Sequence, residues 1–138
     1  MDVFSKEKRS WVMSQVGGKN TGPELLVRSM LHRMGYRFRL HRRDLPGCPD
    51  IVLPKHRKVV FVHGCFWHGH ENCARASRPA TRRGFWDAKL DANEERDKRA
   101  KDELERLGWQ VLIVWECQTG DKAALRRILK EFLHGEQA

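Results

Sequence analysis

Three cysteines and one histidine constrain the fold of this chain more than any other residues. Cys65, His70 and Cys73 lie within one short loop in a C-x4-H-x2-C arrangement, and Cys117 follows a distant apolar run. Four nitrogen and sulfur ligands suit a tetrahedral Zn²⁺ ion, and a zinc site filled entirely by protein ligands is structural. The spacing therefore predicts a structural zinc site that pins this loop to a sheet.

A second interpretation of these residues stays open from spacing alone. Cysteines of a cytoplasmic protein, which we expect this to be, are more often metal ligands or buried thiols than disulfides. The cluster could thus be three buried thiols beside a polar histidine. Cys48 lies between Gly47 and Pro49, outside the cluster, and we interpret it as a structural thiol.

Hydrophobic periodicity and turn residues predict an α/β chain. Thr21 and Glu24 fit a capping box, so a helix should begin at Thr21 and end near Gly35. The other expected elements are strands at 36–41, 49–53 and 58–64 in a β-meander, a helix at 85–107, a strand at 109–115 and a helix at 123–133. At 138 residues, we expect one domain at 21–138, preceded by a basic N-terminal arm at 1–20.

The long helix expected at 85–107 has a polar interruption. Its apolar residues recur on one stripe, which Asn93 and Asp97 break near the middle. This part of the helix is predicted to face a functional site.

The charge balance favours a polyanionic partner. Lys and Arg number 27 against 18 Asp and Glu, a formal net charge of +9. Such charge promotes binding to phosphates through counterion release, so nucleic acid is the expected partner. There is no long apolar run, lipidation signal or signal-peptide core, so no membrane association is expected.

Asp50, His63 and His68 are candidates for catalysis. Asp50 opens one expected strand and His63 closes the next, so adjacent strands would bring the carboxylate beside the histidine-rich loop. A carboxylate there can hold Mg²⁺ at a phosphate, and a neutral imidazole can take a proton from water. Taken singly, Asp50 also fits a turn carboxylate, and each histidine also fits a solvated loop residue.

Aromatic and basic residues surround the expected zinc loop. Phe66 and Trp67 could wedge between base pairs if the loop is rigid, or they could pack in the core. The stretch RASRPATRR then supplies four arginines that could contact phosphates or could form a merely solvated loop: Arg75, Arg78, Arg82 and Arg83.

Several segments resemble the very-short-patch repair endonucleases, or Vsr nucleases. They lie in the family's order and cover most of the chain from about residue 8 to 117: LPGCPDIV at 45–52, VFVHGCFWHGH at 60–70, PATR at 79–82, FW at 85–86, NEERDKR at 93–99 and LGWQVLIVWEC at 107–117. The combination of HGCFWH with a distant VWEC is specific to this family.

The resemblance implies a restriction-endonuclease-like fold of the PD-(D/E)XK type, a mixed sheet flanked by helices. It implies that Asp50 and the backbone carbonyl of Val62 hold a catalytic Mg²⁺ ion. His68 is implied as the base and His63 as a residue that assists at the same phosphate. Glu24 matches a first-helix glutamate that reaches the water molecules around the metal, although the capping box explains it equally well.

The remaining implied roles concern zinc and DNA. The zinc ligands are implied to be Cys65, His70, Cys73 and Cys117, and Phe66 and Trp67 match aromatics inserted beside the mispair. Met13 matches a residue that intercalates from the opposite groove. Two departures are visible: the spacing from His70 to Cys73 is one residue longer than in the best-known form of the motif, and Val62 replaces threonine.

The resulting hypothesis is a Mg²⁺-dependent endonuclease that nicks DNA 5′ to the thymine of a T:G mispair, where 5-methylcytosine has been deaminated. We expect a monomer that binds mismatched double-stranded DNA, with other repair proteins as further partners. Two alternatives remain: a restriction-type or junction endonuclease without a mismatch requirement, and a non-catalytic zinc DNA-binding module.

Overall fold

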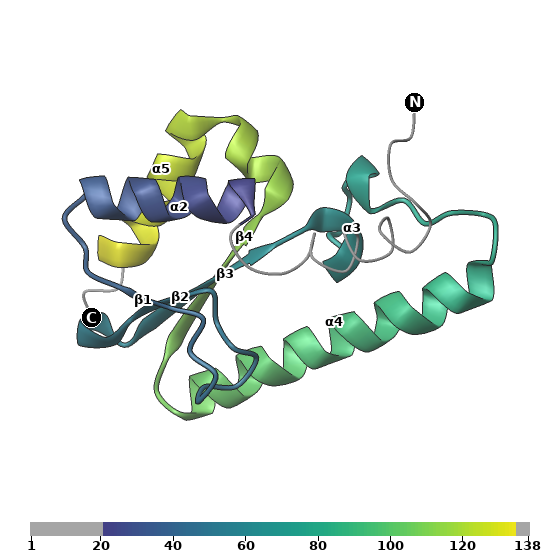
Figure 1. Cartoon of the computed structure of the whole chain (residues 1–138), viewed down its shortest axis with the longest axis horizontal. Helices are drawn as coiled ribbons and strands as arrows, with labels where there is room; N and C mark the ends of the chain where they lie inside the picture. The colour runs from purple at the N-terminus through teal and green to yellow at the C-terminus, as the bar shows by residue number, and fades with distance from the viewer. Residues whose placement is uncertain (1–20, 135–138) are drawn as a thin grey trace, which may run out of the picture.

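A computed structural model describes residues 21–134 of the chain, which form a mixed four-stranded sheet with helices on both faces (Figure 1). The strands follow the order β1-β2-β3-β4 across the sheet, with the bounds Arg39–Leu40, Ile51–Leu53, Lys58–His63 and Gln110–Trp115. The expected α/β class and the helix-flanked mixed sheet are confirmed.

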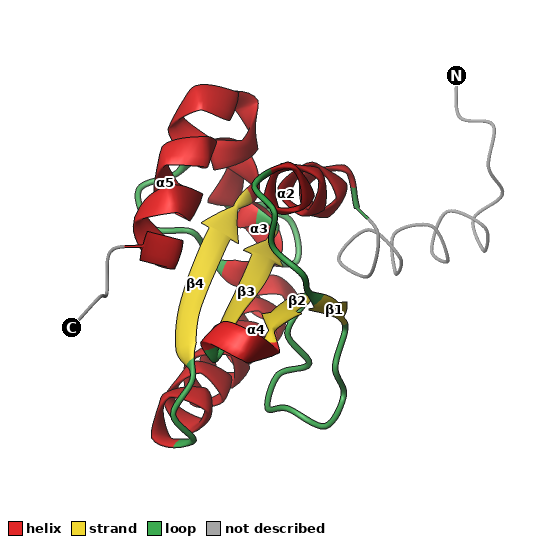
Figure 2. Ribbon diagram, turned by 90° about the vertical axis from the view of Figure 1, so that its left-hand side faces the viewer, coloured by secondary structure: helices red, strands yellow, loops and turns green. Residues whose placement is uncertain are grey.

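The first three strands form the predicted meander, and β4 then joins the sheet parallel to β3 (Figure 2). Ile51 pairs with Val60 across the antiparallel β2–β3 ladder. In the parallel β3–β4 ladder, His63 pairs with Trp115. The carboxyl ends of β3 and β4 therefore meet at one edge of the sheet.

Two helices cover one face of the sheet. They are α2, Gly22–Arg33, and α5, Lys122–His134 (Figure 1). Val27 of α2 and Leu129 of α5 are fully buried against strand residues that include Val60 and Val114. Burying an apolar side chain of this size contributes roughly 1.5–3 kcal/mol.

The long helix α4, Arg83–Arg106, covers the opposite face. Leu104 of this helix packs with Val59, Phe61 and Trp109. Successive residues of β3 thus enter alternate cores, which explains why a continuous apolar sequence forms this strand.

The strand expected at 36–41 is shorter in the structure. Only Arg39 and Leu40 pair with β2, and both are exposed at the sheet edge. Tyr36 and Phe38 instead pack against the core beneath α2 and α5. Core contact, and not ladder pairing, therefore accounts for the apolar character of that segment.

Short helical segments complete the fold. After β3 comes α3, Cys65–His68, which the sequence did not predict, and single turns form η1, Pro54–His56; η2, Ala74–Ala76; and η3, Glu116–Gly120. No helix within residues 21–134 has the length and apolar composition needed to cross a membrane.

Candidate active site and metal centre

Three groups of titratable side chains gather around the ends of β3 and β4. In each group the potential ligand atoms lie within 4.8 Å of one another. The groups are Glu24, His41 and Asp50; His63, His68 and Asp97; and Cys65, His70, Cys73 and Cys117. The sequence had pointed to all of these residues except His41, although it predicted for Asp97 only that it faces a site.

Asp50 lies next to the end of β3, as the strand order predicted. Its Oδ2 accepts a hydrogen bond of 2.8 Å from the backbone N–H of Val62. Burial raises the pKa of Asp50 to about 6, opposed by the Val62 hydrogen bond and assisted by the nearby Glu24 carboxylate. Bringing a cation to this carboxylate would relieve the cost of burying its charge.

Glu24 combines a backbone role with a separate side-chain role. Its backbone N–H donates to Thr21 Oγ1 at 3.3 Å, which caps α2. Its buried carboxylate does not complete the capping box but contacts Arg28 and accepts a 2.9 Å hydrogen bond from His41 Nε2. The carboxylate is therefore directed to the site while the backbone serves as the cap.

His41 joins this group through an uncommon backbone conformation. Its φ is +48°, in the left-handed region, and its backbone N–H donates to the Asp50 carbonyl at 3.1 Å. The side chain is only 12% exposed. No sequence motif indicated His41, because the left-handed turn that directs its side chain toward Glu24 cannot be predicted from the residues RLHRRD.

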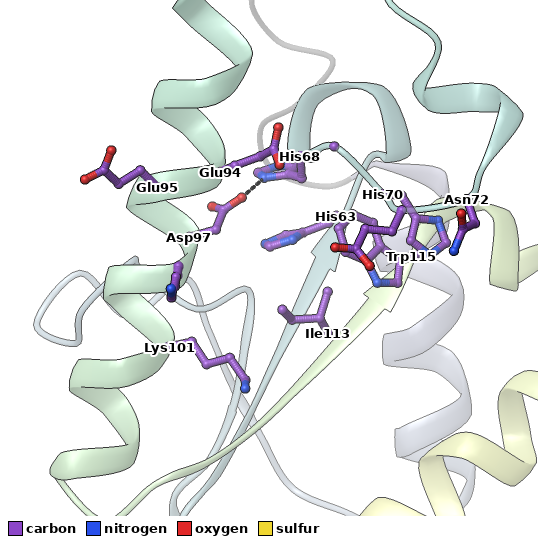
Figure 3. Close-up of a pocket in the computed structure, with 13 residues that line it drawn as sticks. His63, His68, His70, Asn72, Glu94, Glu95, Asp97, Lys101, Ile113 and Trp115 are labelled. Atoms are coloured by element: carbon purple, nitrogen blue, oxygen red, sulfur yellow. Dashed lines mark hydrogen bonds and ion pairs between the residues drawn. The ribbon is translucent and has the colours of Figure 1, made fainter.

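His68 is held by Asp97 of the long helix. Its Nδ1 donates to Asp97 Oδ2 across 2.5 Å (Figure 3). Because Nδ1 carries the proton toward the carboxylate, the neutral ring has its lone pair on Nε2. This arrangement prepares Nε2 to accept a proton.

His63 lies flat against His68, with ring centroids 3.8 Å apart. Burial lowers the pKa of His63 to about 3, with a further decrease from His68 and an opposing effect from Asp97. Its buried Nδ1 has no hydrogen-bond partner among the described atoms. His63 is consequently a neutral ring with an unsatisfied polar atom, less basic than an ordinary histidine.

Both histidines border a cavity of about 750 Å³ between α4 and the ends of β3 and β4 (Figure 3). Asp97 and Lys101 line it from α4, and Trp115 lines it from β4. The predicted polar interruption of α4 is confirmed to face the site, because Asp97 contacts His68 and Asn93 donates to the Trp67 carbonyl at 3.2 Å.

The cysteine and histidine group is assembled from three segments of the chain. Cys65 lies at the start of α3, His70 and Cys73 lie in the following loop, and Cys117 lies in η3. All four cysteines of the chain are free thiols, and Cys48 is outside the group. Three thiols and an imidazole at such separations fit a tetrahedral zinc ion.

The surroundings of these thiols also suit a metal. Burial raises the pKa of the Cys65 thiol to about 11, so a buried thiolate requires a cation. His70 Nδ1 lies 3.5 Å from Cys117 Sγ, and its ring stacks on Trp115 with centroids 4.2 Å apart. The stacking fixes the ring plane of the expected ligand.

Phe66 and Trp67 of α3 belong to an aromatic cluster. Trp86 of α4 completes it, with ring centroids 5.4 Å from Phe66 and 6.0 Å from Trp67. Phe66, Trp67 and Trp86 are partly exposed. From the sequence, Trp86 was expected on the apolar stripe of its helix and in the FW segment at 85–86, whereas its contact with α3 depends on tertiary packing.

The four candidate phosphate contacts differ in their partners. Arg75 is 61% exposed and lies 3.8 Å from Glu116, and Arg83 pairs with Asp87. Arg82 covers the ring of Phe85 at 4.5 Å. Arg78 differs from the others because it binds three carboxylates of α4.

Met13 and the expected basic arm lie outside the described residues.

Comparison with known proteins gives concordant results. The sequence profile described as "DNA mismatch endonuclease Vsr" matches residues 1–75. The chain is 52% identical over 132 residues to the "Type II nicking enzyme V.XorIIP" of Xanthomonas oryzae, with 96% of each chain covered. It is 42% identical over 142 residues to the "DNA mismatch endonuclease Vsr" of Escherichia coli, with 99% of this chain and 90% of that protein covered.

A further relative is the "Type II nicking enzyme V.NmeAIP" of Neisseria meningitidis. It is 43% identical over 132 residues, with 96% of this chain and 94% of that protein covered. These similarities extend well beyond the segments that carry the motifs.

Proposed function

The chain belongs to the Vsr family of DNA mismatch endonucleases, and from this premise we propose that it nicks double-stranded DNA 5′ to the thymine of a T:G mispair. The nick would begin very-short-patch repair where 5-methylcytosine has been deaminated. The observation that carries this proposal is the convergence of Asp50, His68 and Asp97, from three separate segments, at the end of β3.

The proposed metal site consists of Asp50 and the backbone carbonyl of Val62. Mg²⁺ bound there would neutralise charge on the scissile phosphate as it is attacked. The hydrogen bond from Val62 N–H to Asp50 holds the carboxylate beside this stretch of backbone. Glu24 and His41 would act around the metal site, since both lie within the same ligand group as Asp50.

His68 is the proposed general base. With Nδ1 bonded to Asp97, Nε2 can take the proton of the attacking water, and Asp97 stabilises the resulting imidazolium. His63 is a poor base because burial holds its pKa near 3. Its unsatisfied Nδ1 is better suited to a hydrogen bond with a water molecule that links it to the phosphate.

Mismatch selection is proposed to come from the cluster of Phe66, Trp67 and Trp86. A mispaired step stacks less well than a paired one, so insertion of these rings costs less free energy there. The expected zinc ion would keep α3 rigid while these rings insert into the DNA. Arg75, Arg82 and Arg83 would contact the flanking phosphates. Met13 is proposed to insert from the opposite groove.

In this proposal the fold is of the restriction-endonuclease-like type. Residues 21–138 would form the nuclease domain and residues 1–20 a basic arm. The candidate catalytic side chains gather at the sheet edge where Asp50 meets the end of β3, and this location supports the assignment. The mixed sheet with helices on both faces supports it as well.

One second candidate has specific support. Relatives such as V.XorIIP and V.NmeAIP are named type II nicking enzymes, so nicking of one strand without a strict mismatch requirement is the alternative activity. The same residues would catalyse either reaction. The two differ in whether a perfectly paired duplex is cut.

The experiment uses zinc-loaded protein, Mg²⁺ and duplexes labelled separately on each strand, with one T:G mispair or the corresponding T:A pair in several flanking sequences. We expect a single nick on the thymine strand of the mispaired duplex. Asp50→Asn should abolish it, because the amide cannot supply a charged metal ligand. Asp102→Asn, the same replacement at an exposed position of α4, is the control and should nick normally.

Each other outcome would reject a specific part of the proposal. Equal nicking of T:G and T:A duplexes would replace mismatch repair with general nicking. Binding without nicking under all conditions would leave a non-catalytic DNA-binding protein. Full activity of Asp50→Asn would remove Asp50 from the metal site.

A further inference from the structure

Arg78 makes a set of contacts that differs from those of the other arginines in its loop. Its Nη1 donates to Asp87 at 2.8 Å, and its Nη2 donates to Asp91 at 2.8 Å and to Glu94 at 2.9 Å. Its side chain is 21% exposed, against 61% for Arg75 and 58% for Arg83. The guanidinium is thus occupied by protein carboxylates.

The three carboxylates form one stripe on α4. Positions 87, 91 and 94 recur every three or four residues, so they face the same side of the helix, and Asp97 continues the series by one turn. Without a cation, these like charges would repel one another and shift the side chains. Arg78 contacts all three carboxylates and offsets part of their mutual repulsion.

Glu94 connects the stripe to the segment that carries the catalytic histidine. A Cβ atom placed on Gly69 would lie 2.5 Å from the Glu94 carboxyl carbon, so the carboxylate lies directly against the Gly69 backbone. Gly69 has φ of +65° and ends α3 immediately after His68. The position of Glu94 therefore determines how closely this turn approaches α4.

Neighbouring residues of α4 hold the same turn. Asn93 donates to the Trp67 carbonyl, and Asp97 accepts from His68. Three consecutive residues of the turn, Trp67, His68 and Gly69, accordingly rest on adjacent positions of one helix.

We propose that Arg78 is a positioning residue that clasps the loop after the zinc ligand Cys73 to α4 and, through Glu94, sets the turn carrying Trp67 and His68. This deepens the proposed function and rests on it for the role of His68. It assigns Arg78 to the interior of the site, in place of the DNA-phosphate contact that its sequence context favours.

The two possible roles of Arg78 predict changes in different measured quantities when Arg78 is replaced by alanine. A phosphate contact contributes about 0.9 to the slope of log K against log salt, so its loss should weaken DNA binding and lower that slope by about this amount. A clasp instead displaces His68, so we expect kcat to fall between about ten- and a hundredfold. The salt slope should match that of Arg99→Ala, which removes the same charge from an exposed pair on α4.

Glu94→Gln provides the second variant, in case Arg78→Ala folds poorly. If the clasp is correct, Glu94→Gln lowers kcat as Arg78→Ala does, and the double variant loses little more than either single one. Additive losses, or an unchanged kcat in Glu94→Gln, would overturn the proposal.

A measurement without DNA separates this proposal from the proposed function. In ¹⁵N-labelled, zinc-loaded protein, the His68 Nδ1–H resonance should be protected from exchange and should lose that protection in Arg78→Ala. Unchanged protection would reject the clasp whether or not the protein nicks DNA. Loss of protection with no T:G nicking by the wild type would retain the clasp and reject only the function.

Discussion

The imidazole rings of His63 and His68 are stacked, with their centroids 3.8 Å apart and their planes inclined by 10°. Two rings in contact cannot both carry charge without repulsion, and burial already holds the pKa of His63 near 3. The pair therefore has one ring that stays neutral and one, bonded to Asp97, that can accept a proton. We therefore expect His68 to act as the general base and His63 to assist without becoming charged.

We expect His68→Ala to reduce kcat for nicking by a factor of about 10²–10⁴, the range typical for loss of a general base. Asp97→Asn should also reduce kcat, because the amide can favour the wrong tautomer of His68. His63→Ala should instead raise KM and leave more residual kcat. Single-turnover nicking on a T:G duplex measures these effects, and a larger kcat loss for His63→Ala than for His68→Ala would reverse the assignment.

Asp50 should destabilise the Mg²⁺-free protein at neutral pH. Its pKa is about 6 in the folded protein and near 3.8 when unfolded, so the folded state holds its proton more tightly. Stability consequently falls as pH rises from about 4 to about 6, and the full penalty persists above pH 6. The difference between these two pKa values corresponds to at most about 3 kcal/mol.

Asp50→Asn should therefore raise the free energy of unfolding at pH 8 by about 1–3 kcal/mol and have little effect near pH 4. Urea unfolding of zinc-loaded, Mg²⁺-free protein at both pH values measures this. Asp102→Asn serves as the exposed control. A destabilised Asp50→Asn at pH 8 would contradict the interpretation.

Removal of the expected zinc ion should unfold the protein, whereas removal of Mg²⁺ should only stop cleavage. We expect about one zinc per chain by elemental analysis, and loss of zinc and of cooperative unfolding in Cys65→Ser and Cys117→Ser. Cys48→Ser is the matched control because this free thiol lies outside the cluster. A zinc-free protein with unchanged circular dichroism and melting temperature would refute the structural role.

The aromatic cluster should determine selectivity for the mispair more than the rate of bond cleavage. Trp67→Ala should weaken T:G duplex binding roughly 5- to 150-fold, since stacking on a base contributes about 1–3 kcal/mol. Trp86→Ala should have a related effect, because its ring supports Trp67 at 6.0 Å. Binding to T:G and T:A duplexes by anisotropy tests this, and equal weakening on both would argue for general DNA contact.

Local sequence patterns predicted the elements well. Capping by Thr21 and the meander follow from spacing over a few residues, and the placement of Asp50 beside the end of β3 follows from strand adjacency. The strand at 109–115 was expected, but its parallel pairing with β3 was not predicted. Polar residues within an apolar stripe correctly indicated that Asn93 and Asp97 face a site. Each of these signals is local or depends on neighbouring strands.

Partners across long stretches of sequence could not be predicted in the same way. That His68 pairs with Asp97 depends on where α4 crosses the sheet, and His41 reaches Glu24 only through a left-handed backbone turn. Arg78 shows the limit most clearly. A basic stretch predicts exposure to phosphate, but packing against α4 gives this arginine three carboxylate partners.

The parallel ladder would give the expected zinc ion a role during folding as well as in the folded protein. Cys65 and Cys117 each lie two residues beyond the paired His63 and Trp115. Sliding β4 by one residue would move Cys117 by about 3.3 Å and reverse which of its side chains face each core. A metal ion that requires both thiols would therefore favour the correctly aligned strands, so its capture would verify the β3–β4 register.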